Sequence, residues 1–135
     1  MKFPSILASL TLIPTLAVAD SVSFDQVYDD GAESLNNVAC SDGPTGLETK
    51  GFTTFSSLPN FPFIGGAAAV EGFGSVNCGT CWSLTFVTST GVSNTISVLA
   101  IDHAGTGFNI ALAAMNALTD NQAIQLGRVD ATAAQ

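Results

Sequence analysis

Two cysteines three positions apart, Cys78 and Cys81 in the segment NCGTCW, have the spacing that most directly suggests chemistry in this chain. A Cys-x-x-Cys pair can serve as a redox-active dithiol, as half of a zinc site, or as two neighbouring anchors in a disulfide framework. Each use requires different surroundings, so the rest of the sequence is needed to choose between them.

Zinc and redox chemistry both fit the surroundings poorly. A structural zinc site takes four cysteine or histidine ligands, and the chain offers only Cys40, Cys78, Cys81 and His103, without a second clustered pair. No metal site is therefore predicted. A reactive dithiol typically lies at a helix N-terminus, whereas the residues after Cys81 alternate as in a strand. A structural disulfide remains, and three cysteines leave one thiol over.

The N-terminal segment has the features of a secretory signal. Lys2 precedes an apolar run that ends in the cleavage-like pattern AVA at Ala19, so residues 1–19 are predicted to be removed. The run is too short for a membrane span and is interrupted by proline. We therefore expect a single secreted domain over residues 20–135, in a compartment where disulfides form.

Charge narrows the class of partner. The chain carries 3 basic and 11 acidic residues and a formal net charge of −8. Binding to nucleic acid or to anionic lipid requires a basic surface, so neither a nucleic acid nor a membrane is expected as a partner. No phosphate loop or other cofactor motif is present, so no cofactor is predicted. A neutral partner is favoured, such as a glycan, a small molecule or an uncharged protein surface.

Strand patterns dominate the expected secondary structure. Apolar and polar residues alternate in SVSF (21–24) and in CWSLTFV (81–87), whereas TISVLAID (95–102) is apolar enough to be buried on both faces. A final strand is predicted over residues 123–134, with Gly127 as a bulge or a point of close approach. These segments indicate a mainly β protein.

Helical spacing is confined to two segments. A helix is predicted from about Gly107 onward because apolar residues recur three and four positions apart: Phe108, Leu112, Met115 and Leu118. A shorter helix is predicted over residues 67–71, and residues 43–66 have the composition of a long ordered loop. The resulting fold class is a β-barrel with one or two short helices.

Several blocks of the sequence together resemble the cerato-platanins, a family of small secreted fungal proteins. They occur in the family's order over residues 21–135: SVSFDQVYDD, ACSDGPTGL, LPNFPFIGG, NCGTCW, VLAIDHAGTGFNIALAAMNALT and AIQLGRVDATAAQ. The resemblance implies a six-stranded double-psi β-barrel, similar to expansin and barwin-type domains. It also implies an extracellular or cell-wall location.

The resemblance also bears on the cysteines. Family members carry four cysteines in two disulfides, which assigns the bridge in this chain to Cys40 and Cys78. The family's remaining bridge would join Cys81 to a cysteine in a C-terminal tail beyond Gln135. Because no such cysteine is in this sequence, the tail is expected to be missing and Cys81 is predicted to be unpaired.

Carried over residue by residue, the family's sugar-contact positions fall on Asp102 and Asn109. Tyr28 corresponds to an aromatic residue at the rim of the groove. Sugar hydroxyls need a strong acceptor and an amide that can both donate and accept. Each of the two polar residues also has a structural alternative, because Asp and Asn often cap helix N-termini.

The neighbours of these residues are assigned structural roles. His103 follows Asp102 directly and is expected to point to the opposite face of the strand, as a structural or surface histidine. Asp29 and Asp30 are expected in a solvated acidic turn.

The function expected from the resemblance is non-enzymatic binding of chitin or N-acetylglucosamine oligomers. Expansin-like loosening of the wall and elicitation of plant defence through a plant receptor are further family properties. Most glycosidases use two carboxylates, and in this sequence only Asp102 has a place in a motif, which argues against hydrolysis. Weak polysaccharide hydrolysis is therefore kept only as the alternative function. A surface-active structural role is a third possibility.

Overall fold

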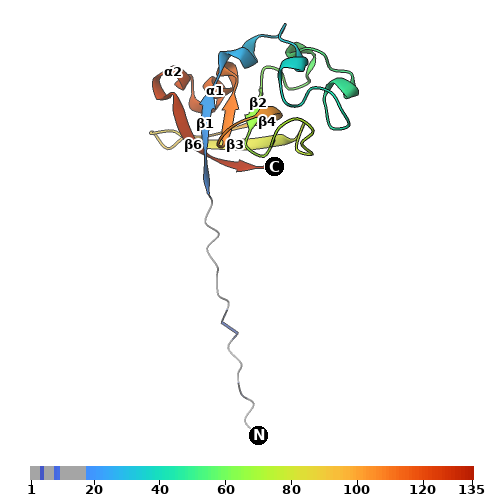
Figure 1. The fold of residues 1–135 in the computed structure, drawn as a ribbon. Coiled ribbons are helices and arrows are strands. Elements are labelled where there is room, and N and C mark those ends of the chain that lie inside the picture. Colours follow the sequence, from blue (N-terminus) through green and yellow to red (C-terminus); the bar gives the residue numbers. More distant parts are fainter. Residues whose placement is uncertain (1–3, 5–7, 10–17) are drawn as a thin grey trace.

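Six strands close into a barrel with the neighbour order β1-β5-β2-β4-β3-β6 (Figure 1). This computed structural model describes residues 4, 8, 9 and 18–135, so the predicted signal segment lies almost entirely outside the described residues. The strands are β1 Ala19–Phe24, β2 Ile64–Ala67, β3 Cys81–Val87, β4 Ser93–His103, β5 Phe108–Ile110 and β6 Arg128–Ala134. Two α-helices follow β5 in the chain, α1 Leu112–Thr119 and α2 Ala123–Leu126.

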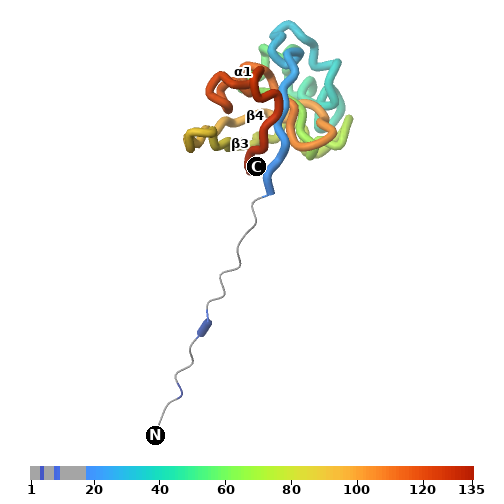
Figure 2. Tube along the Cα trace, turned by 90° about the vertical axis from the view of Figure 1, so that its left-hand side faces the viewer, coloured from blue at the N-terminus to red at the C-terminus, as the bar shows by residue number. Residues whose placement is uncertain are grey.

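Two parallel strand pairs set the topology. β1 lies parallel to β5 and β2 lies parallel to β4, whereas the other four neighbouring pairs are antiparallel. The antiparallel pair of β1 and β6, at the two ends of the described chain, can be followed in Figure 2 as adjacent blue and red tubes. The predicted fold class, a mainly β six-stranded double-psi barrel with one or two short helices, is confirmed.

The alternation predicted for β3 matches its packing. Leu84 is fully buried, and Trp82 and Phe86 pack against the same core from the same face of the strand. In β4 the residues alternate at first and are then continuously buried from Val98 to Ile101. The buried half of β4 therefore belongs to the hydrophobic core.

The helix predicted from Gly107 begins later than its apolar spacing indicates. Residues Phe108–Ile110 form β5, which pairs with both β1 and β2, and α1 starts only at Leu112. Gly107 has a φ of +51°, and a Cβ at this position would collide with the Ser21 carbonyl oxygen. The chain thus approaches β1 closely enough for strand pairing to replace the first helical turn.

Two further predictions were wrong. The short helix expected at residues 67–71 is absent, because the chain instead ends strand β2 at Ala67 and continues in turns. The segment expected to be a strand over 123–134 begins with α2 and becomes β6 only after Gly127, which ends the helix with a φ of +67°.

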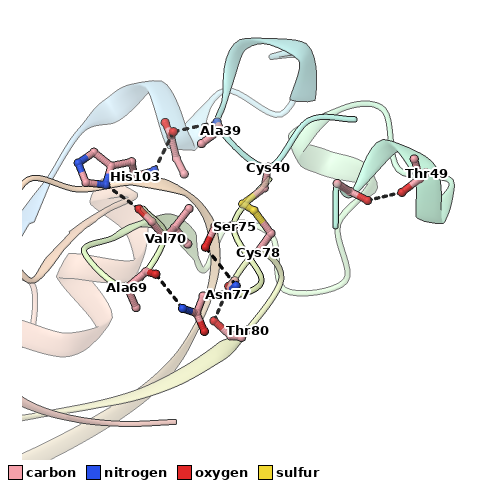
Figure 3. Close-up of a disulfide and its surroundings, with 12 residues drawn as sticks. Ala39, Cys40, Thr49, Ala69, Val70, Ser75, Asn77, Cys78, Thr80 and His103 are labelled. Carbon is pink, nitrogen blue, oxygen red and sulfur yellow. Dashed lines mark hydrogen bonds between the residues drawn. A yellow bond between two sulfur atoms is a disulfide. The ribbon is translucent and has the colours of Figure 1, made fainter. Parts of the chain in front are cut away.

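A layer of turns covers one side of the barrel, away from α1 and α2 in Figures 1 and 2. Most of it is irregular, with short 3-10 turns at Gln26–Asp29, Leu35–Asn37, Glu48–Lys50 and Phe55–Ser57. The Cys40–Cys78 disulfide joins this layer to the segment that precedes β3, with Cα atoms 5.4 Å apart (Figure 3). Backbone hydrogen bonds from Cys40 and Gly79 to carbonyls of β4 attach both sides of the bridge to the barrel.

Within the part of the chain that is described, no helix is both long and apolar enough to cross a membrane.

Candidate functional site

The predicted site residues Asp102 and Asn109 lie in one row across three neighbouring strands. Gly66 of β2 is the register partner of Asn109 in β5 on one side and of Asp102 in β4 on the other. Ser23 of β1 extends the row, because it pairs with Asn109 and its Oγ donates a 3.0 Å hydrogen bond to Asn109 Oδ1. Neighbouring strands are about 4.8 Å apart, so roughly 10 Å separates the backbones at Asn109 and Asp102.

Asp102 is held by three donors from the protein itself. Its Oδ2 accepts a hydrogen bond from Tyr28 Oη at 3.0 Å. Its Oδ1 accepts from the backbone N–H groups of Ala39 at 3.0 Å and His103 at 2.8 Å. A carboxylate offers about four acceptor positions, so one remains for a ligand. Asp102 therefore ties the turn layer to β4 and keeps a limited capacity to accept from a sugar hydroxyl.

Tyr28 supports Asp102 from inside the protein. Its side chain is only 4% exposed and stacks on Phe55, with ring centroids 6.1 Å apart. Burial raises the pKa of the Tyr28 phenol well above its usual value, and the negative charge of Asp102 raises it further. The phenol therefore stays protonated and remains a donor to the carboxylate. Its place in the site is to hold Asp102, since its ring presents no open face to a glycan.

Asp29 has a role that the sequence interpretation missed. Its Oδ2 accepts from the backbone N–H of Leu112 at 2.7 Å, and its Oδ1 accepts from Ala113 at 2.9 Å. These are orphan donors of the first turn of α1, so Asp29 caps this helix from 83 residues away. The prediction of a solvated turn is correct for Asp30, which is exposed, but it is wrong for Asp29. Asn109 lies in a strand, so its capping alternative is also wrong.

A polar hollow of about 600 Å³ opens beside Asn109. Its lining comes from β1, from the end of β4 and the loop after it, from β5 and from β6: Ser23, His103, Ala104, Gly105, Thr106, Asn109 and Arg128. Asp102 and Tyr28 do not line it, and no carboxylate does. The structure thus brings Tyr28 and Asp102 together and places Asn109 in a separate, neighbouring feature.

Two basic side chains of the hollow are anchored by hydrogen bonds. His103 Nδ1 lies 2.6 Å from the Val70 carbonyl oxygen, which can only accept, so Nδ1 carries the proton (Figure 3). Arg128 Nη1 donates a 2.6 Å hydrogen bond to Ser21 Oγ. Sequence reasoning missed the hollow, although the two side chains are the only histidine and the only arginine of the chain.

The cysteines provide a bridge and one thiol. The Cys40–Cys78 disulfide, the pairing that the resemblance implied, is present with a sulfur–sulfur distance of 2.09 Å. Cys81 is unpaired and exposed at the first position of β3, so its environment is a strand and not a helix N-terminus. Among the residues described, no group of histidine, cysteine or acidic side chains is arranged to hold a metal ion.

The fold agrees with the comparison to known proteins. The cerato-platanin family model matches residues 20–135. The chain belongs to the cerato-platanin family. The protein named allergen Asp f 15 homolog, from Arthroderma benhamiae, is 51% identical, and the match covers 98% of this chain and 65% of that relative. The chain therefore spans about 65% of the length of this relative.

Solved cerato-platanin structures have the same fold. The crystal structure of cerato-platanin 1 from M. perniciosa superposes with a TM-score of 0.84 at 40% identity, covering 86% of this chain and 94% of the other. The solution structure described as that of the fungal elicitor Cerato-Platanin superposes with a TM-score of 0.69 at 35% identity, covering 85% and 90%.

Proposed function

We propose that this cerato-platanin is a secreted, non-catalytic fungal protein that binds chitin or N-acetylglucosamine oligomers at the surface around Asn109. The observation that carries the proposal is the open polar hollow beside Asn109, whose lining mixes donors with acceptors and contains no carboxylate. A shallow surface of this kind suits an extended sugar chain, because successive units can lie along it.

The contacts available to a sugar are several and individually weak. Asn109 uses its Oδ1 for Ser23, which leaves the amide Nδ2 to donate to a hydroxyl or to an acetamido carbonyl. Thr106 adds a hydroxyl in the same hollow. Asp102 lies outside the hollow, in the same register row as Asn109, and has one acceptor position left. Each hydrogen bond contributes a net stabilisation of about 1 kcal/mol, so a few of them give binding in the millimolar range, near −4 kcal/mol.

The arrangement of acids supports binding without cleavage. Glycoside hydrolysis generally requires two carboxylates on either side of the scissile bond. The hollow is lined by none, and the Asp102 carboxylate already accepts three hydrogen bonds from protein groups. Non-hydrolytic loosening of packed polysaccharide is compatible with such a surface. The description of one solved relative as a fungal elicitor supports an elicitor role, with a plant receptor as a second partner.

The test is an NMR titration of the secreted protein with the N-acetylglucosamine trimer. We expect backbone shifts confined to the hollow and the row from Ser23 to Asp102. Asn109→Ala removes one of the few hydrogen bonds and should weaken the binding several-fold. Asn36→Ala, on the exposed turn layer, is the matched control and should bind as the wild type does. Absence of shifts at millimolar sugar, or equal loss in both variants, would contradict the proposal.

Two further measurements separate the alternatives. Asp102→Ala should weaken sugar binding and, because it leaves Tyr28 and Ala39 without an acceptor, also lower the free energy of unfolding by about 2 kcal/mol. Retained binding in this variant would remove Asp102 from the sugar surface. Incubation with chitin should release no new reducing ends, and their release would favour the hydrolase.

A further inference from the structure

We infer that the hollow beside Asn109 recognises glycans whose units carry a carboxylate, such as short oligomers of a uronic acid, with Arg128 as the group that binds the carboxylate. The inference deepens the proposed function and rests on it, because it assigns a substrate class to the same hollow.

One of the two lysine or arginine side chains of the described residues, Arg128, lies in this hollow. The chain has 11 acidic and 3 basic residues, and its sole arginine and sole histidine both line the hollow. Lys50, the other cation of the described residues, does not line it. No carboxylate is among the lining residues, although acids outnumber cations throughout the chain. The hollow is therefore the place on this acidic protein that is best suited to a negative group.

Arg128 has unused donors at the right position. Its guanidinium carries five N–H donors, and the hydrogen bond to Ser21 Oγ uses one of them. In the register of β1 and β6, Arg128 lies opposite Ser23, the residue that is bonded to Asn109. A carboxylate can accept two parallel hydrogen bonds from such a guanidinium, which gives both strength and orientation.

His103 and Asn109 fit the rest of a sugar unit. Because His103 Nδ1 donates to the Val70 carbonyl, Nε2 is the ring nitrogen left to face a sugar hydroxyl. The free amide Nδ2 of Asn109 can donate to a hydroxyl oxygen. The lining thus pairs one cation with both acceptors and donors, which matches a carboxylated sugar better than a bare anion.

Nearby acids limit the size of the ligand. Asp130 lies two residues after Arg128 on β6, opposite Ser21, so its side chain is on the same face of the strand. Its negative charge opposes a ligand carboxylate at Arg128. The net charge of −8 repels a long polyanion as a whole. This repulsion is screened beyond about 8 Å at physiological salt, so a short oligomer whose one carboxylate enters the hollow is favoured.

The test compares two probes with the same sugar backbone, the charged trigalacturonate and its uncharged, fully methyl-esterified form, by NMR titration of the intact secreted protein. Hydrogen bonds to charged groups contribute about 1.5–3 kcal/mol, so we expect the acid to bind at least about tenfold more tightly than the ester. Arg128→Gln should remove this difference. Lys50→Gln changes the net charge equally and should preserve it, and Asp130→Asn should increase the affinity for the acid.

The outcomes separate this inference from the proposed function. Equal binding of acid and ester, or equal weakening by Arg128→Gln and Lys50→Gln, would overturn the inference. The inference would also be overturned if acetate or inorganic phosphate displaced trigalacturonate and bound with the same affinity as the sugar acid does. If the N-acetylglucosamine trimer still binds in these cases, the proposed function stands alone, and if neither sugar binds, both fail. Unchanged fluorescence of Trp82, the only tryptophan, shows that each variant is folded, and Asp130→Asn tests the inference with Arg128 intact.

Discussion

Tyr28 Oη donates a 3.0 Å hydrogen bond to Asp102 Oδ2, although 74 positions separate the two residues in the chain. Burial of the phenol, followed by the negative charge of Asp102, raises the Tyr28 pKa far above the usual 10.0. Because the folded-state pKa lies above the unfolded value, the contribution of the buried, protonated phenol to stability is fully present below pH 10. The stabilisation is lost progressively as the pH rises above that value toward the folded-state pKa.

The tyrosinate absorbance of the native protein is expected to stay absent at about pH 11, where an unfolded tyrosine is mostly ionised. Tyr28 is the only tyrosine, so the signal reports on it alone. The unfolded protein should titrate near pH 10, and Asp102→Asn should shift the native titration toward that value because it removes the carboxylate charge. Native ionisation near pH 10 in the wild type would contradict the coupling of the two residues.

Asp29→Ala is expected to lower the free energy of unfolding by about 1 kcal/mol, since it leaves the N–H groups of Leu112 and Ala113 without their acceptor. Denaturant unfolding followed by Trp82 fluorescence measures this change. The neighbouring Asp30→Ala serves as the control, because Asp30 accepts only from Ala32 in an exposed turn. A cost for Asp30→Ala equal to that for Asp29→Ala would show that the helix cap is not the cause.

The parts of this fold that could be predicted are those that local periodicity determines. Alternation in β3 placed Leu84 in the core, and the spacing of Met115 and Leu118 placed both on the buried side of α1. These patterns can be recognised without knowing which segment packs against the element, because a single buried face sets the period of apolar residues along a strand or a helix.

The rest depends on contacts between distant segments. Phe108 and Ile110 fit the start of a helix as well as a strand, and only their pairing with β1 and β2 decides for a strand. The cap from Asp29 to α1 has no local signal. The hollow likewise requires closure of the barrel, which brings Arg128 of β6 beside Ser23 of β1.

Loss of the Cys40–Cys78 disulfide is expected to lower the free energy of unfolding by about 4 kcal/mol in a chain-entropy description of the unfolded state. The bridge links residues 38 positions apart and fastens the turn layer to the segment before β3. The paired substitution Cys40→Ala and Cys78→Ala, measured by denaturant unfolding, tests the value.

Cys81 provides the control for the cysteine assignment. Native protein should react with one equivalent of a thiol reagent at the exposed Cys81, and reduced, unfolded protein should react with three. Cys81→Ala should leave stability within about 0.5 kcal/mol of the wild type. Three reactive thiols in the oxidised native protein would contradict the bridge.

At Gly65 the backbone of β5 lies close against β2, and Gly65→Ala is expected to destabilise the barrel by about 3 kcal/mol or more. A Cβ at Gly65 would collide with the Asn109 carbonyl oxygen and lie 2.6 Å from Ile110 Cα, and both are backbone atoms that cannot move aside. Pairing of β2 with β5 also holds Asn109 in the site row, so sugar binding should fall together with stability.

Gly105→Ala is the matched comparison for Gly65→Ala. Gly105 lines the hollow, but nothing lies within 4 Å of a Cβ added there. The free energy of unfolding of the Gly105→Ala variant should stay within about 0.5 kcal/mol of the wild-type value. If Gly65→Ala were as stable as Gly105→Ala, the close approach of β2 and β5 would not be what positions Asn109. A stable Gly105→Ala with altered sugar affinity would instead place the ligand against the loop between β4 and β5.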